Sequence, residues 1–168
     1  MKNKVLFAVL MFACFIYAQA QTLLDVNSSR TVNLIVDFSK ASIHNMNEEE
    51  FSTYEPNYIR LKPEVIGKLA EEFNDSEKVK FMIGNFPNAS YAIKVTILSV
   101  STKGNITSSA DVVDKNGKTI ASVPEMYGDG GTFGSKMNLM GDGCKSTGKV
   151  LAKKLAKLIK IEAKKATK

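Results

Sequence analysis

The stretch Tyr91–Met126, YAIKVTILSVSTKGNITSSADVVDKNGKTIASVPEM, decides the fold. Apolar residues alternate with other residues from Tyr91 to about Thr102, as in a strand that buries one face. Two short turns, Lys103-Gly104-Asn105 and Asn116-Gly117, divide this segment from two further alternating segments. The stretch therefore predicts an antiparallel meander with strands at 91–102, 106–113 and 119–126.

Before the meander, two further strands and one helix are expected. Apolar side chains alternate over residues 31–39 and again, briefly, over Val79–Ile83. Between them, apolar residues recur at helical spacing after Pro63, a residue suited to the first turn of a helix, and Asn74-Asp75 ends this helix. Residues 44–60 are polar and predict an irregular segment with one helical turn near Glu48–Ser52.

After the meander, a loop and a final helix are expected. Residues 128–143 contain six Gly and predict a long loop over the sheet edge, held to the core by Phe133 and by Met137 or Leu139. The helix that follows has an apolar stripe opposite a ladder of lysines and should fray at residues 165–168. The ladder consists of Lys149, Lys153, Lys157, Lys160 and Lys164.

These elements predict an α+β fold: a mostly antiparallel sheet of about four to five strands, with two amphipathic helices packed on one face. The domain is expected to span residues 31–164, after a short polar lead at 21–30. The chain has 168 residues, which fits a single domain.

The first twenty residues have the pattern of a secretory signal peptide. Lys2 and Lys4 precede the apolar run Val5–Tyr17, and Ala18-Gln19-Ala20 supplies small residues before a cleavage site at Gln21. The run is too short to span a bilayer, which needs roughly 20 apolar residues, and no transmembrane helix is expected in the mature chain. The protein is therefore expected in the periplasm or outer envelope.

Two other fates of the leader remain open. It could remain as an uncleaved anchor, or Cys14 could receive a lipid. Met11 and Phe12 do not resemble a lipidation motif and the apolar run continues past Cys14, so cleavage before Gln21 is preferred.

Charge is unevenly distributed along the chain. Residues 145–168 carry nine Lys and one Glu, whereas residues 21–144 carry twelve basic and sixteen acidic residues. The lysine ladder could contact anionic lipid, lipopolysaccharide or an acidic protein, or it could be a solvated helix face. Nucleic-acid binding is not expected, because no aromatic residues interleave with these lysines.

No catalytic, cofactor-binding or metal-binding residue is predicted, and no cofactor. The segment Gly143–Val150 fits a phosphate-loop spacing as far as Lys149, but Val150 stands where Ser or Thr would hold Mg²⁺. The acids at 48–50 are expected in a solvated loop, and His44 has no second His with which to complete a zinc site.

The glycine-rich region offers one candidate loop site, formed by Asp129, Phe133, Asp142 and Cys144. The two aspartates lack the spacing of a calcium loop. Cys144 is the sole cysteine after cleavage and is expected to be a small buried residue, with an intermolecular disulfide or a catalytic thiol as alternatives.

The second half of the chain resembles a family of uncharacterised exported envelope domains of Bacteroidetes-type bacteria. The resemblance rests on the paired segments Tyr91–Ser101 and Ile106–Asp114, Asn116-Gly117-Lys118, the GGTFG loop at 130–134 and the terminal amphipathic helix. In outline, residues 31–160 are similar to the small α/β domain at the start of TolB-like periplasmic proteins. The resemblance implies no catalytic residues.

The sequence thus favours a non-enzymatic exported module that binds an envelope protein or another envelope component. One alternative is a binder of anionic lipid or lipopolysaccharide through the C-terminal lysine face. The other is an enzyme of unrecognised type that uses Cys144 or the 128–143 loop.

Overall fold

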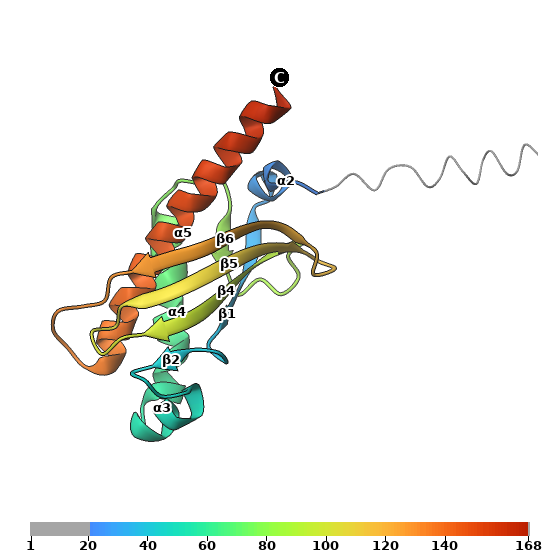
Figure 1. Ribbon diagram of the computed structural model, residues 1–168. Coiled ribbons are helices and arrows are strands. Elements are labelled where there is room, and N and C mark those ends of the chain that lie inside the picture. The colour runs from blue at the N-terminus through green and yellow to red at the C-terminus, as the bar shows by residue number, and fades with distance from the viewer. Residues whose placement is uncertain (1–20, 168) are drawn as a thin grey trace, which may run out of the picture.

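The computed structural model describes residues 21–167, and Figure 1 shows one sheet with helices packed behind it. The predicted signal peptide at 1–20 and its Cys14 lie outside the described residues. Over the described residues the chain is α+β, as expected from the sequence. Its elements are α2 (Leu23–Ser28), β1 (Thr31–Asp37), β2 (Ser42–Ile43), α3 (Glu48–Tyr54), α4 (Tyr58–Asp75), β3 (Met82–Gly84), β4 (Tyr91–Val100), β5 (Ile106–Asp114), β6 (Thr119–Gly128) and α5 (Lys136–Ala166).

The predicted meander is confirmed. β4, β5 and β6 are antiparallel neighbours in a sheet of order β3-β1-β4-β5-β6, with β2 paired to the far end of β4. The turn between β5 and β6 has Gly117 at φ 80°, and Asp114 accepts hydrogen bonds from the amides of Asn116 (2.8 Å) and Lys118 (2.9 Å). Positive φ at glycine costs little, so this turn sets the register of the hairpin.

The rest of the sheet is parallel, and the expectation of a mostly antiparallel sheet is wrong there. β1 is parallel to both β3 and β4, and β2 is parallel to β4. The chain leaves β1, returns through α4 and enters β3 in the same direction, as a helical crossover requires. Alternation of apolar residues indicates which face of a strand is buried but not the direction of the neighbouring strand. The parallel pairing of β1 could therefore not be predicted from this alternation.

The segment expected to be irregular forms helix α3 and the first turn of α4. Asn47 and Glu50 make a capping box at the start of α3, with the Asn47 side chain accepting from the Glu50 amide at 2.9 Å. α4 begins at Tyr58 rather than at Pro63, because Tyr58 is fully buried and packs edge-on against Phe51 with ring centroids 5.2 Å apart. This aromatic contact joins the two helices.

The predicted long loop at 128–143 is also wrong beyond Ser135, since α5 begins at Lys136. Glycines of α5 allow neighbouring backbone to approach the helix closely. A Cβ on Gly148 would lie 2.2 Å from the carbonyl oxygen of Leu69 in α4, and a Cβ on Gly143 would lie 2.0 Å from that of Gly104. Glycine is unfavourable in a helix, but here it lets α5 lie directly against α4 and the β4–β5 turn.

The lead segment 21–30 contains the short helix α2. Thr22 and Asp25 form its capping box, and Leu23 and Val26 are buried. α2 packs against α5, and Figure 1 shows α5 running on past it.

The core lies between the helices and one face of the sheet. The other face of the sheet is open, and it carries Ile35 and the 43% exposed Leu98 among small polar residues. No helix within residues 21–167 is long and apolar enough to cross a membrane.

Candidate functional site

The candidate loop site does not assemble. Phe133 is 89% exposed at the tip of the 129–135 loop, so it does not hold that loop to the core as expected; the buried Met137 does. Asp142 lies against the same loop, because a Cβ on Gly131 would approach its carboxylate oxygen to 2.2 Å. The backbone amide of Asp129 donates to the Ser146 hydroxyl at 3.0 Å, which fastens the loop to α5.

Cys144 is fully buried, as expected for a small apolar residue. Burial raises the pKa of its thiol to about 12, although the charge of Lys68 acts in the opposite direction. Asp142 is exposed on the other side of the same helix. A thiol with this pKa stays protonated at neutral pH and has the character of a core residue rather than of a nucleophile.

His44 and the acids at 48–50 take part in local structural contacts. His44 packs its ring edge-on against Phe51 at 5.0 Å. Glu50 belongs to the α3 capping box, and Glu48 is bound to Lys62 and Tyr58. Within residues 21–167 no three His, Cys, Asp or Glu side chains gather closely enough to hold a metal ion.

The five lysines of the ladder are exposed along α5, from Lys149 to Lys164. At a rise of ~1.5 Å per residue the ladder is about 22 Å long. The structure thus places them on one extended, basic helix face.

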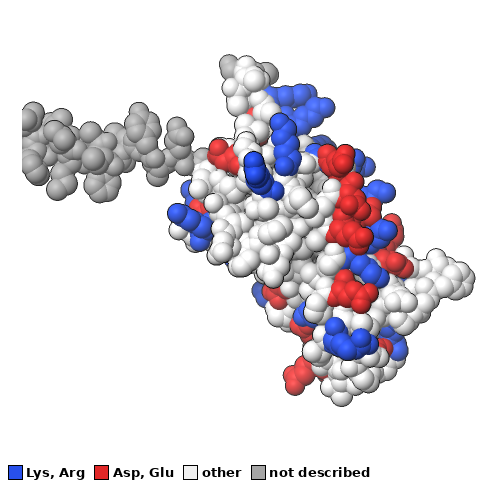
Figure 2. All heavy atoms as spheres, turned by 180° about the vertical axis from the view of Figure 1, so that it is seen from behind, with Lys and Arg blue, Asp and Glu red and all other residues white. Residues whose placement is uncertain are grey.

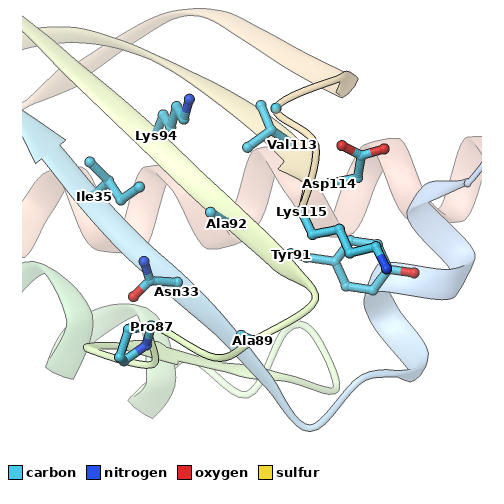
Figure 3. Close-up of a pocket in the computed structure, with 11 residues that line it drawn as sticks. Asn33, Ile35, Pro87, Ala89, Tyr91, Ala92, Lys94, Val113, Asp114 and Lys115 are labelled. Carbon is cyan, nitrogen blue, oxygen red and sulfur yellow. The ribbon is translucent and has the colours of Figure 1, made fainter.

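One pocket lies on the open face of the sheet, with a volume of about 260 Å³ (Figure 3). The segment between β3 and β4 crosses β1 here, and Figure 3 shows its Pro87 beside Asn33. Asn33 accepts a hydrogen bond from the Phe86 amide (2.9 Å), and Asp114 at the other end of the pocket is used by the β5–β6 turn. These polar groups serve the fold, which leaves a shallow depression.

A larger groove, of about 690 Å³, runs between β1 and α4 on the helical side of the molecule. Its walls are mostly apolar, and Ile59 at one end is 67% exposed. It is lined by Leu34 and Val36 of β1, by Ile59, Lys62, Pro63, Ile66, Gly67 and Ala70 of α4, and by Gly84 and Asn85.

The groove exists because α4 has two adjacent apolar stripes. One stripe, centred on Val65 and Leu69, is buried under the sheet. The second, containing Ile59, Ile66 and Ala70, is only partly covered. The sequence reasoning missed this site, although an apolar surface wider than one core stripe was a signal that could have indicated it.

The floor of the groove is an unpaired strand edge. The ladder between β1 and β3 ends at the pair Asn33↔Gly84, whereas the ladder with β4 continues to Asp37↔Thr96. Residues 34–37 of β1 therefore have a neighbouring strand on one side only. Their half-buried Leu34 and Val36 face the groove from this edge.

Beyond Ile59 the groove meets a polar pocket of about 430 Å³ with two glutamates, Glu48 and Glu49, in its lining. Burial acts to raise the pKa of Glu48, but hydrogen bonds from Lys62 and Tyr58 outweigh it and lower that pKa. The Lys62 ammonium also lies 4.9 Å from the centre of the Phe38 ring. Lys62 is thus engaged by Glu48, whereas Glu49 remains exposed.

The outer rim of the groove carries two glutamates beside Gly67, and the exposed Arg60 stands one turn before them. Glu64 and Glu71 of α4 are exposed and stand three residues before and four residues after Gly67, so the three positions adjoin on the helix surface. Figure 2, a view from the helical side, shows a column of acidic side chains, with basic ones among and beside them, next to a broad uncharged area. The site thus combines an apolar groove, an open strand edge and two exposed glutamates on its rim.

No family model matches the chain, and no curated protein matches it. Among solved structures, the chain is similar to the PelC dodecamer from Paraburkholderia phytofirmans, with a TM-score of 0.42, 12% identity, and coverage of 74% of this chain and 89% of that one. It is also similar to a DUF330 protein from Xanthomonas campestris, with a TM-score of 0.39, 8% identity, and coverage of 83% and 90%. Both similarities are too distant to assign a function to this chain.

Proposed function

We propose that this protein is a non-enzymatic binding module of the cell envelope that takes a protein partner in the groove between β1 and α4. The observation that carries the proposal is the groove itself, an apolar channel of about 690 Å³ open to solvent beside an unpaired strand edge. Apolar surface of this kind, rimmed by charge, is typical of protein-binding sites. The signal-peptide pattern of residues 1–20 and the resemblance to exported domains support the envelope location.

The alternative of an enzyme is less well supported. It depends on Cys144, which is buried with a raised thiol pKa, or on the region 128–143, whose Phe133 and Asp142 do not converge with that thiol. A reaction centre needs a nucleophile or acid within reach of a supporting group, and neither anchor offers this arrangement.

The test is partner capture with matched variants. Mature protein is crosslinked in envelope extracts of its host as wild type, as Ile59→Asp and as Leu98→Asp. Ile59 lies in the groove, and Leu98 is an exposed apolar residue on the open sheet face. We expect one partner to be recovered with wild type and Leu98→Asp and to be reduced at least tenfold with Ile59→Asp. Equal recovery with all three proteins, or no partner with any, would refute the proposal.

A second candidate function is contact of the lysine face of α5 with anionic lipid or lipopolysaccharide. The favouring observation is the exposure of all five lysines along one helix. Each basic residue near an anionic surface contributes about 1 kcal/mol, so reversal of three charges should abolish binding. We expect the triple variant Lys153→Glu, Lys157→Glu, Lys160→Glu to lose sedimentation with phosphatidylglycerol vesicles. Unchanged sedimentation would exclude this function.

A further inference from the structure

We propose that the partner enters the groove as an extended peptide that adds a strand to the free edge of β1 beside residues 34–37. Its apolar side chains would pack over Gly67 and its basic residues would meet the two glutamates on the rim. This inference rests on the proposed function and specifies how the partner binds and what its sequence must contain.

The backbone of β1 is oriented to accept such a strand. The amide of Met82 in β3 donates to the carbonyl of Arg30 at 3.0 Å, so the polar groups of Arg30 point toward the β3 side. Backbone groups alternate sides along a strand, so those of Val36 point the same way, beyond the last β1–β3 pair at Gly84. A peptide in line with β3, ~4.8 Å from β1, would pair with them.

The groove supplies the side-chain pockets that strand addition requires. Alternate side chains of the added strand would face α4, where Ile59, Pro63 and Ile66 form an apolar wall. The half-buried Leu34 and Val36 would become buried beneath them. Main-chain hydrogen bonds would thus give affinity, and the apolar wall would select the side chains.

No contact within the described residues accounts for a glycine at position 67 of α4. It lies in the middle of the helix, where glycine is less favourable than alanine by about 1 kcal/mol. Apart from its chain neighbours and the adjoining backbone of α4, no atom lies within 4 Å of the position that its Cβ would occupy, unlike Gly148, whose Cβ would collide with the Leu69 carbonyl. The missing side chain therefore serves no contact within the described structure but widens the groove for an occupant.

Charge selects a basic occupant. Glu64 and Glu71 flank Gly67, and neither takes part in an ion pair among residues 21–167, where the two pairs are Lys62–Glu48 and Lys145–Glu72. The groove also leads past Ile59 to the exposed Glu49. Lys or Arg on the face of the peptide that meets α4, beside Val, Ile or Leu on that same face, would complement this rim.

The experiment selects peptides and then maps how they bind. Random twelve-residue peptides displayed on phage are panned against mature protein, with a peptide-binding PDZ domain as the control bait. Enriched peptides are synthesised with a fluorophore, and their Kd is measured by anisotropy. We expect enriched sequences that place apolar residues, together with Lys or Arg, at every second position.

Variants locate the binding site. We expect Gly67→Trp to weaken binding at least tenfold, and the solvent-exposed control Lys157→Trp to leave it within about twofold. Glu64→Gln with Glu71→Gln should weaken it several-fold and reduce its dependence on salt, because exposed charge pairs are screened. Unchanged binding to Gly67→Trp, or enrichment of acidic peptides, would overturn the inference.

A scan with N-methyl groups tests strand addition itself. N-methylation removes one backbone donor at a time, and a strand offers its donors to β1 at every second residue. We expect Kd to rise at least tenfold at alternate positions and little between them. A loss of affinity that does not alternate along the peptide would overturn the inference. So would a selection that enriches no peptide on this protein while the PDZ control enriches its own peptides. If partner capture remained sensitive to Ile59→Asp in that case, the proposed function would stand without it.

Discussion

Cys144 shows how much of a site can be judged at the scale of one residue. The sequence correctly predicts a buried thiol, because a lone cysteine in an exported protein is most often a small buried apolar residue. It places Phe133 wrongly, since a phenylalanine between glycines looks like an anchor but stands 89% exposed. Composition indicates that a residue is apolar, but which direction it faces depends on where the helix begins.

The buried thiol predicts a pH dependence of stability. The pKa of Cys144 is raised from 9.0 to about 12, so the folded state favours the protonated form. Its contribution is complete below pH 9 and is lost as the pH rises from 9 toward 12. We expect wild type to lose about 1 kcal/mol more than Cys144→Ala between pH 8 and pH 10.

Urea unfolding of both proteins at the two pH values measures this difference. Tyrosines and lysines titrate in both proteins, so subtraction of the two curves removes their effect. Equal losses in the two proteins would contradict the prediction.

At the scale of elements, the glycines Gly67 of α4 and Gly148 of α5 differ in their surroundings. Gly67→Ala should stabilise the protein by about 0.5–1 kcal/mol, because alanine favours the helix and the space is empty. Gly148→Ala should destabilise it by about 1–3 kcal/mol, because α5 must move away from the Leu69 carbonyl. Thermal unfolding of the two variants checks the opposite signs, and a shift of the same sign in both would show that the glycines are equivalent.

The elements predicted from sequence succeed where local patterns decide them. The meander follows from alternation and two turns, which involve neighbours in the chain. The start of α5 does not follow from local patterns, because its glycines disfavour a helix. Contacts with α4 and with Gly104 compensate for that unfavourable free energy. Local patterns also do not predict the parallel neighbours of β1, because the chain reaches them through a helix. Nor do they predict the groove, which depends on how α4 lies across β1.

At the scale of the whole molecule, charge divides the surface between two candidate contacts. The rim of the groove carries Glu64 and Glu71, whereas α5 extends past the body with its lysines exposed. The two proposed contacts therefore respond in opposite ways to the charge of a partner. A basic peptide would favour the groove, and an anionic surface would favour α5.

The short open edge of β1 also affects whether one molecule can pair with another through its sheet. Exposed sheet edges template the growth of sheets from chain to chain. Here the unpaired segment is confined to residues 34–37, bounded by β3 on one side. At the opposite edge, Pro124 of β6 lacks an amide hydrogen and the Glu125 carbonyl is bonded by Lys154. The unpaired stretch of β1 is therefore short, which limits the pairing of one copy with another.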